Sequence, residues 1–223
     1  MNTLRTTQPE MRSQAEATPP AASPLLVVIS APSGGGKTTL CQQLLAARPE
    51  MTRAITCTTR PARPGEQDGV DYYFLDPASF LRRVRACDFL EHATVYGHSY
   101  GTLKSEVLGK LGQGKNVLLN VDVQGAATLL QRARENPELG RALVSVFLTP
   151  PSMAVLEARL RKRGTDAPAV IQKRLSLARQ EIARWKQFDY LILSASIGED
   201  LRRMLAIIEA ERLRCARVSP PEL

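Results

Sequence analysis

The sequence predicts an α/β protein in which a parallel sheet is flanked by helices, and three observations predict it. Short apolar runs alternate along the chain with longer segments of helical periodicity, which is typical of strands joined by helical crossovers. A glycine-rich turn at residues 30–39 joins the first apolar run to the first helical segment. Residues 117–121 are apolar except for Asn120, as expected for a parallel strand that is covered on both faces.

The expected elements follow one another in a regular order. Residues 25–29 form the first strand, and the helix after the turn carries Leu40, Leu44 and Leu45 on one face. Proline and glycine after residue 60 break the next strand-like stretch, and Asp76 caps a short helix. Further strands are expected at 52–60, 70–74, 89–96, 116–121, 142–148 and 190–193. Further helices are expected at 76–86, 103–111, 124–134, 152–163, 169–187 and 200–216.

The composition indicates one globular domain with inserted segments. The chain has 223 residues, of which 43% are hydrophobic, and no apolar run is long enough to span a membrane. Residues 1–24 lack periodicity and are expected to be a disordered tail without a secretion signal or transit peptide. The domain is expected over 25–216, with a core of 25–51 and 103–216, an inserted lobe over about 52–102, a helical lid over about 152–187 and a flexible C-terminus at 217–223.

Charge and cysteine usage restrict the classes of function. The net charge is +8, and the segment 151–187 contains nine basic and three acidic residues. Such a local cluster suits a small polyphosphate as well as a nucleic acid, and the segment lacks the interleaved aromatic residues that stack on single strands. The four cysteines form no C-x-x-C pair and the chain has two histidines, which argues against a zinc site. Reduced thiols in a cytoplasmic protein are expected.

The stretch from Ser30 to Thr39 is a candidate phosphate-binding loop, because a strand, a glycine-rich turn, Lys-Thr and a helix follow one another. Glycines let backbone N–H groups approach phosphate oxygens, and the helix N-terminus adds partial positive charge. Lys37 supplies an ammonium for the outer phosphates, and Thr38 supplies a hydroxyl for Mg²⁺. Ala31 occupies the first glycine position of the motif, which is acceptable where φ is negative. A nucleoside triphosphate is therefore expected to bind at Ala31, Pro32, Ser33, Gly34, Gly35, Gly36, Lys37, Thr38 and Thr39.

A second candidate anion site lies on the proline-stiffened loop at residues 59–66. Arg60 and Arg63 are three residues apart, and guanidinium groups bind phosphate through two parallel hydrogen bonds. Tyr72 and Tyr100 are candidates to add hydroxyl donors. A solvated basic loop is the alternative interpretation, and proximity to a phosphate-binding loop favours the functional one.

Two acidic residues are candidates for the site. Asp122 follows the apolar strand at 117–121, where the usual acidic partner of a phosphate-binding loop supports Mg²⁺. Glu91 lies in an otherwise apolar strand. It is either an edge residue that faces water or a carboxylate that accepts two N–H bonds from a base.

A third group of basic residues surrounds the break at residues 164–168. Arg159 and Arg163 are spaced to share one helix face, and Arg174 follows on the next helix. Arginines on both sides of a glycine- and proline-containing break are typical of a lid that brings positive charge over transferring phosphates. A solvated helix face explains Arg161 and Lys162 better.

One similarity to another class is set aside. Residues 122–125 fit the D-x-x-G motif, and residues 194–196 are similar to a guanine-contacting element of switch GTPases. The N/T-K-x-D motif of that class is absent from the sequence, which argues against a switch GTPase.

Taken together, the motifs resemble those of the guanylate kinase family, in family order and spacing over about residues 25–215. The matching motifs are residues 30–39, Thr58-Thr59-Arg60-x-x-Arg63-x-Gly65-Glu66, Asp71-Tyr72, Phe89-Leu90-Glu91-His92-Ala93, Tyr100-Gly101, Asp122-x-Gln124-Gly125-Ala126, Arg159-x-x-x-Arg163-Gly164 and Lys173-Arg174. The resemblance implies a P-loop NTPase-type parallel sheet with an inserted mixed β/α GMP-binding lobe and a helical lid. It also implies ATP-dependent phosphorylation of GMP and dGMP to GDP and dGDP in purine nucleotide metabolism, by direct in-line transfer with Mg²⁺.

The resemblance further implies a role for each candidate residue. The GMP phosphate would be held by Arg60, Arg63, Tyr72 and Tyr100. Glu91 would bond guanine N1 and the 2-amino group, and Thr56 and Thr102 would reach O6. Asp122 would lie between nucleotide and metal, with Thr38 as the other metal-binding residue. Charge during transfer would be neutralised by Lys37, Arg159, Arg163 and Arg174.

Two positions depart from the family pattern. The family usually has an acid at the position of Asn120, which bears on Mg²⁺ ligation, and Asn-Asp at the positions of Ser194 and Ala195, which bears on the adenine contact. Three alternatives stay open: another nucleoside-monophosphate or sugar-phosphate kinase, a non-catalytic interaction module, and nucleic-acid binding. The expected partners are ATP and GMP or dGMP, without nucleic acid or membrane. The oligomeric state is left open, with a homodimer as one option.

Overall fold

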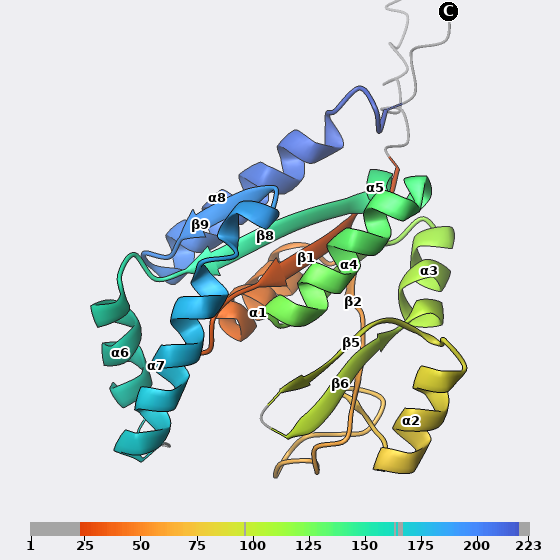
Figure 1. The fold of residues 1–223 in the computed structure, drawn as a ribbon. Helices are drawn as coiled ribbons and strands as arrows, with labels where there is room; N and C mark the ends of the chain where they lie inside the picture. The colour runs from red at the N-terminus through yellow and green to blue at the C-terminus, as the bar shows by residue number, and fades with distance from the viewer. Residues whose placement is uncertain (1–22, 96, 163, 165–166, 219–223) are drawn as a thin grey trace, which may run out of the picture.

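A five-stranded parallel sheet forms the centre of the fold (Figure 1). The structure is a computed structural model that describes residues 23–95, 97–162, 164 and 167–218. The strand order is β2-β7-β1-β8-β9. The strands are β1 (Leu26–Ser30), β2 (Met51–Arg53), β7 (Asn116–Asn120), β8 (Leu143–Thr149) and β9 (Tyr190–Leu193). The expected α/β fold with a parallel sheet is confirmed.

The central strand β1 lines up the ends of its two neighbours. It pairs in parallel with β7, where Ile29 lies opposite Asn120, and with β8, where Ser30 lies opposite Phe147. All five residues of β1 are buried because helices cover both faces of the sheet. Parallel strands end at one edge, so the segments that leave β1 and β7 emerge next to each other. This edge is where the functional residues gather.

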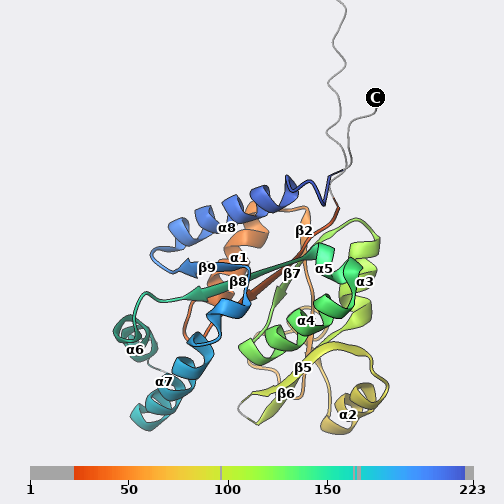
Figure 2. The same cartoon turned by 45° about the horizontal axis from the view of Figure 1, so that its top comes forward.

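Two apolar layers cover the two faces of the sheet, and side chains that alternate along β1 contribute to both. Leu26 and Val28 pack with α4 (Val123–Glu135) and with α3 (Lys104–Gly112). Val27 and Ile29 pack with α1 (Lys37–Ala47) and α8 (Ile197–Arg212) on the other face. Figure 2 shows α8 and α4 on opposite sides of the sheet. The short helix α5 (Pro137–Ala142) lies against α4 and adds Leu139 to the first layer.

A second, smaller sheet forms the inserted lobe. Its strand order is β4-β3-β6-β5, with one parallel and two antiparallel pairings. The elements are β3 (Thr56–Thr58), β4 (Tyr73–Phe74), α2 (Pro77–Arg85), β5 (Phe89–Val95) and β6 (His98–Leu103). Cys57, Phe80 and Phe89 form its own buried cluster, so the lobe is held together separately from the main sheet.

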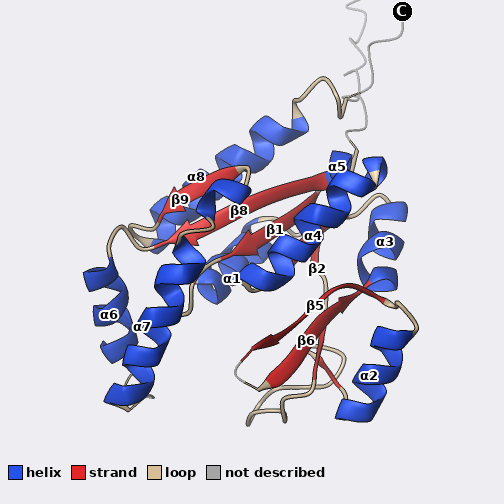
Figure 3. Cartoon of the chain, in the orientation of Figure 1, coloured by secondary structure: helices blue, strands red, loops and turns tan. Residues whose placement is uncertain are grey.

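A helix pair forms the second projection from the main sheet. It consists of α6 (Met153–Lys162) and α7 (Pro168–Ile182), followed by a 3₁₀ turn η1 (Trp185–Gln187). Leu156, Leu160 and Ile171 are among the residues of a small apolar cluster that joins the two helices. In Figure 3 the pair and the inserted lobe project from the same side of the main sheet. The single helix expected over 169–187 is therefore interrupted after Ile182.

Two expectations about the lobe are wrong. The strand-like stretch at 52–60 is two strands in two sheets, because β2 pairs with β7 of the main sheet and Ala54 donates its N–H to Leu118 O at 2.9 Å. The core therefore extends to Arg53, two residues beyond the expected boundary at 51. Gly97 and Gly101 predict the end of the preceding strand, whereas the structure has strand β6 over His98–Leu103. Gly101 lies inside β6 because the ring of Phe89 covers it, where a Cβ would overlap the ring.

The chain ends also differ from expectation. The expected flexible segment 217–223 begins too early, because Arg217 is buried and its guanidinium donates to Arg141 O at 2.7 Å and Leu143 O at 3.0 Å. Ser23 donates its N–H to Arg217 O at 3.0 Å, so the domain begins before residue 25. Residues 1–22 and 219–223 of the two expected tails lie outside the described residues. Within the described part of the chain, no helix combines the length and apolar character needed to cross a membrane.

Candidate active site

The glycine-rich loop connects β1 to α1 with a backbone that only glycine adopts readily. Gly34 and Gly36 have φ values of 86° and 97°, in the left-handed region, and Gly36 is the N-cap residue of α1. The loop therefore presents the N-terminus of an eleven-residue helix to its surroundings. Ala31 is buried and has no positive φ, so the alanine fits without backbone strain.

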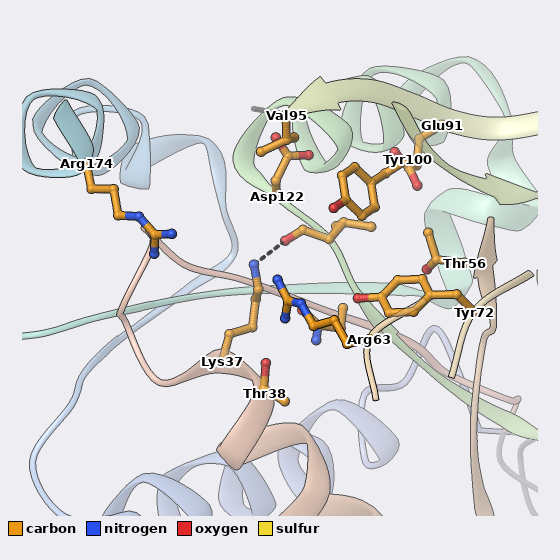
Figure 4. A pocket seen from close by; sticks show the side chains of 12 residues that line it. Lys37, Thr38, Thr56, Arg63, Tyr72, Glu91, Val95, Tyr100, Asp122 and Arg174 are labelled. Atoms are coloured by element: carbon orange, nitrogen blue, oxygen red, sulfur yellow. Dashed lines mark hydrogen bonds between the residues drawn. The ribbon is translucent and has the colours of Figure 1, made fainter. Parts of the chain in front are cut away.

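Lys37 lies at the start of α1 and its side chain extends toward the end of β7. Its Nζ donates a hydrogen bond to Val121 O at 3.1 Å (Figure 4). Burial lowers the pKa of Lys37, and the negative charge of Asp122 opposes this effect. The ammonium is therefore held between the glycine-rich loop and the strand that ends at Asp122.

A cavity of about 290 Å³ joins the glycine-rich loop to the inserted lobe. Figure 4 shows side chains from the loop, the lobe, β7 and α7 around it. The lining residues are Lys37, Thr38, Thr56, Arg63, Tyr72, Glu91, Val95, Tyr100, Asn120, Val121, Asp122 and Arg174. Nine of these were candidates from the sequence, and they come from segments up to 137 residues apart between Lys37 and Arg174.

Glu91 is a buried carboxylate that lines this cavity. Its side chain accepts a hydrogen bond from Thr102 Oγ1 at 2.6 Å, and the residue is 2% exposed. Burial raises its pKa to about 7, against the lowering effect of the Thr102 hydrogen bond. Gly125 on α4 lies so close that a Cβ there would overlap Glu91 Oε2. The carboxylate is therefore fixed by β6 on one side and by the first turn of α4 on the other.

Asp122 caps α4 at the edge of the same cavity. Its Oδ1 accepts a hydrogen bond from Gly125 N at 3.0 Å, as expected for an N-cap residue. Together with Thr38 at the start of α1, it provides the hard oxygen donors that Mg²⁺ takes in phosphate sites, where phosphates and water supply the other ligands. Among the described residues no cluster of three His, Cys, Asp or Glu is arranged for a metal ion. Hydroxyl and carboxylate oxygens fit the ligand chemistry of Mg²⁺.

The two arginines of the 59–66 loop have different environments. Arg63 is exposed and its side chain lines the cavity near Tyr72 and Tyr100 (Figure 4). Arg60 forms a two-point ion pair with Glu66, with distances of 2.8 Å and 2.9 Å, and lies 5.4 Å from the ring centre of Tyr72. Arg60 is not among the residues that line the cavity. The structure therefore brings one of the pair into the cavity and holds the other beside it.

The arginines of the helix pair lie near the glycine-rich loop. Arg174 lines the cavity and donates to Ser33 Oγ at 3.4 Å. Arg159 lines a hollow of about 360 Å³ that runs along residues 32–39. It also lines a neighbouring hollow of about 260 Å³ with Ser194 and Ala195. Arg163, a candidate from the sequence, lies outside the described residues.

Three further residues lie near the loop, and of these the sequence singled out only Ser194, as a departure from the family pattern. Glu181 accepts a backbone hydrogen bond from Ser33, and its buried Oε2 has no hydrogen-bond partner among the described residues. Burial raises the pKa of Glu181, and Lys37 opposes this rise. Ser194 donates a hydrogen bond to Asp200 and accepts hydrogen bonds from Arg159. The only signal for Glu181 was an acid within a mostly basic segment, and nothing in the sequence indicated the other contacts.

The fold and the loop define this chain as a nucleotide-binding enzyme of the P-loop class, because a glycine-rich turn at the end of a parallel strand opens a helix next to a lysine and a threonine. The family model described as guanylate kinase matches residues 23–211. The match covers both sheets and the helix pair. The chain belongs to the guanylate kinase family.

Individual relatives agree with this assignment. The chain is 46% identical to a guanylate kinase of Coxiella burnetii, over 80% of this chain and 83% of the relative. It is 45% identical to a guanylate kinase of Hydrogenovibrio crunogenus, over 81% and 85% of the two chains. The crystal structure of guanylate kinase from Anaplasma phagocytophilum is similar with a TM-score of 0.72 and 32% identity, over 89% of this chain and 92% of that one.

Proposed function

We propose that the protein transfers the γ-phosphoryl group of ATP to GMP and dGMP, with Mg²⁺, and yields ADP with GDP or dGDP. One observation carries the proposal: a single cavity links Lys37 of the glycine-rich loop to Glu91 and Arg63 of the inserted lobe. A donor phosphate chain on the loop and an acceptor nucleotide in the lobe would meet there. Direct transfer between two nucleotides requires that they meet in this way, which supports the proposal.

The donor side is formed by the loop and the helix pair. The N–H groups at the start of α1 and the Lys37 ammonium would hold the β- and γ-phosphates of ATP. In the described structure the Lys37 ammonium already points across the cavity, where it donates to Val121 O. Arg174, which contacts Ser33, and Arg159 supply positive charge beside the loop. These groups stabilise the charge that develops on the transferred phosphoryl group.

The acceptor base is proposed to bind at Glu91. The ionised carboxylate would accept hydrogen bonds from guanine N1–H and from the 2-amino group, and Thr56, which lines the same cavity, would donate to O6. Thr102 would hold the carboxylate rather than reach O6, because its single hydroxyl proton is donated to Glu91. The site excludes adenine because adenine N1 is an acceptor that would face a carboxylate. A site built to pair with donors rejects a base that lacks them by roughly 10⁴-fold.

The acceptor phosphate is proposed to bind between Arg63, Tyr72 and Tyr100, which line one wall of the cavity. Arg60 would join them if its guanidinium exchanged Glu66 for the phosphate, since it already lies beside Tyr72. The phosphate of GMP is anionic at neutral pH, so the transfer needs no strong general base. None of these contacts involves a ribose hydroxyl, which is why dGMP is included with GMP.

When bound, Mg²⁺ would neutralise part of the charge of the phosphates. Thr38 and Asp122 are the residues proposed to hold it, directly or through water. Asn120 also lines the cavity and would act as a neutral neighbour where an acid is usual in the family. Approach of the inserted lobe and the α6–α7 pair would exclude water and so limit hydrolysis of ATP.

We place this reaction in purine nucleotide metabolism in the cytoplasm. The four cysteines, Cys41, Cys57, Cys87 and Cys215, are free thiols, which is consistent with a reducing compartment. The partners proposed are small nucleotides, without nucleic acid or membrane.

The test is ADP release from ATP by the full chain with GMP, dGMP, AMP, CMP and UMP measured side by side. We expect turnover with GMP and dGMP, and a kcat/KM for AMP lower by roughly 10⁴-fold. Comparable rates with AMP or with a sugar phosphate would assign another kinase on this fold. Failure to bind ATP would indicate an interaction module without activity, and a salt-dependent shift with random DNA would support nucleic-acid binding.

A further inference from the structure

Three segments that are distant in the sequence meet beside the glycine-rich loop. Arg159 lies on α6, Ser194 follows the last residue of β9, and Asp200 lies in the first turn of α8. Ser194 is 5% exposed and Asp200 is 7% exposed, so the contact between them is shielded from solvent. Gly36 of the loop lies next to Arg159, since a Cβ at that glycine would be 3.9 Å from Arg159 Nη1.

The hydrogen bonds of Ser194 have a defined direction. Its Oγ is 2.7 Å from Asp200 Oδ2, and because a carboxylate only accepts, the single hydroxyl proton of Ser194 is donated to Asp200. The two lone pairs of the same oxygen accept from Arg159 Nη1 and Nη2, each at 3.1 Å. Asp200 Oδ1 in turn accepts from Ala195 N at 2.9 Å. Asp200 therefore orients Ser194 as an acceptor for the arginine.

This arrangement holds a long side chain without placing a carboxylate directly on it. Both terminal nitrogens of Arg159 bind one neutral oxygen, which fixes the plane of the guanidinium. The negative charge of Asp200 is separated from the guanidinium by the hydroxyl, and both of its oxygens are used by other groups. The cation therefore stays available to the hollow along residues 32–39 that it lines. A cation that is ordered before the nucleotide binds needs less rearrangement during the reaction.

We infer that Ser194 and Asp200 are positioning residues that hold Arg159 over the phosphates of the bound donor nucleotide. The inference rests on the proposed phosphoryl transfer, and it assigns to both residues a role exerted through Arg159. Neither residue needs to touch the nucleotide. The effect of removing the Ser194 hydroxyl must then depend on the presence of Arg159.

The test is a double-mutant cycle on the full chain with Ser194→Ala, Arg159→Ala and the double variant. ADP release is measured at varied ATP with saturating GMP, and then at varied GMP with saturating ATP. We expect Ser194→Ala to lower kcat/KM for ATP about 10-fold in the presence of Arg159 and by less than about twofold in the Arg159→Ala background. The KM for GMP is expected to be unchanged.

Two conservative variants separate positioning from folding. Ser194→Cys keeps the approximate size of the side chain but replaces the oxygen with a weak acceptor, so it is expected to resemble Ser194→Ala. Ser194→Thr keeps the hydroxyl and is expected to retain most of the wild-type activity. Thermal unfolding of each variant gives the fraction folded under assay conditions, and activities are compared per folded protein.

The outcomes distinguish this inference from the proposed function. Equal losses from Ser194→Ala with and without Arg159, or wild-type activity of both Ser194→Ala and Ser194→Cys, would overturn the inference while phosphorylation of GMP stands. Absence of GMP-dependent ADP release in the wild type would overturn the proposed function, and the inference with it.

Discussion

Replacement of Glu91 by glutamine is expected to weaken GMP binding and to stabilise the fold at neutral and higher pH. The carboxylate is buried between Thr102 and Gly125, and burial raises its pKa from 4.5 to about 7. A raised pKa means that the folded protein holds the Glu91 proton more tightly than the unfolded chain does. The proposed acceptor site therefore needs the ionised form of Glu91, which is the form that the fold disfavours.

The size of the effect follows from the two pKa values. The stability that protonated Glu91 contributes is fully present below pH 4.5 and is lost as pH rises through about 7. At about 1.4 kcal/mol for each pH unit, the loss is about 3 kcal/mol. Glutamine has no proton to lose. The free energy of unfolding of Glu91→Gln minus that of the wild type should thus increase by about 3 kcal/mol between pH 4.5 and pH 8.

The assay is equilibrium denaturant unfolding of both proteins across this pH range. Other titrating groups are shared by the two proteins, so they cancel in the difference. A difference that does not change with pH would refute the account of Glu91 as a buried carboxyl group whose ionised form is disfavoured in the folded state.

The same variant tests the role of Glu91 in GMP recognition. With a pKa of about 7, about one-tenth of the wild-type carboxylates are ionised at pH 6 and about nine-tenths at pH 8. The kcat/KM for GMP is expected to fall by about tenfold as the pH is lowered from 8 to 6. The GMP phosphate also gains a proton as the pH is lowered from 8 to 6, and the pH profile of Glu91→Gln measures that contribution alone. An equal pH profile for the two proteins would show that the charge of Glu91 does not matter.

Four further predictions concern separate parts of the structure. Lys37→Ala is expected to remove most of the turnover, by about 10²-fold or more, with an unchanged melting temperature, and near-wild-type rates would contradict its proposed role. Gly125→Ala is expected to raise the KM for GMP more than the KM for ATP, because the new methyl group overlaps Glu91 Oε2; a uniform loss would indicate general misfolding instead. Removal of divalent cations with EDTA is expected to abolish ADP release and added Mg²⁺ to restore it, while retained activity would exclude the metal requirement. Arg217→Ala is expected to lower the free energy of unfolding by about 3–5 kcal/mol, because Glu211 would keep a buried charge without this partner. Chemical denaturation measures this change, and a much smaller one would contradict the prediction.

Much of the main sheet was predictable from the sequence because its elements are long or uniformly apolar. The run at 117–121 and the fully buried strand at 143–149 have no competing interpretation in a parallel sheet. The phosphate-binding loop was predictable from three glycines, a lysine and a threonine in a fixed order. Local chemistry determines both features, so a single sequence is enough.

The boundaries of the inserted lobe were not predictable because tertiary pairing decides them. Residues 51–53 and 56–58 have similar strand propensity, and yet one segment pairs with the main sheet and the other with the lobe. Gly101 suggested a turn, but its close contact with Phe89 shows why glycine is needed inside a strand. Such a requirement depends on a residue twelve positions away that packs across the sheet.

The candidate site shows the same division between local and tertiary information. The motifs and their resemblance to the family identified nine of the side chains that line the cavity, including Arg63, Glu91 and Asp122. It did not indicate that Arg60 is paired with Glu66, although the two residues are close in the sequence. The contact between Ser194 and Arg159 joins residues 35 positions apart and depends on how β9 and α6 are placed.

The hydrogen bond between Ser23 and Arg217 brings the first and last described segments of the domain to one corner. A circular permutant is therefore expected to fold. A short linker would join residue 218 to residue 23, and the new chain ends would lie at the exposed turn around Gln113 and Gly114. This rearrangement leaves every strand of both sheets uncut. It would also move the free ends of the chain to the turn between α3 and β7, which offers a second place to attach a label or a fusion partner.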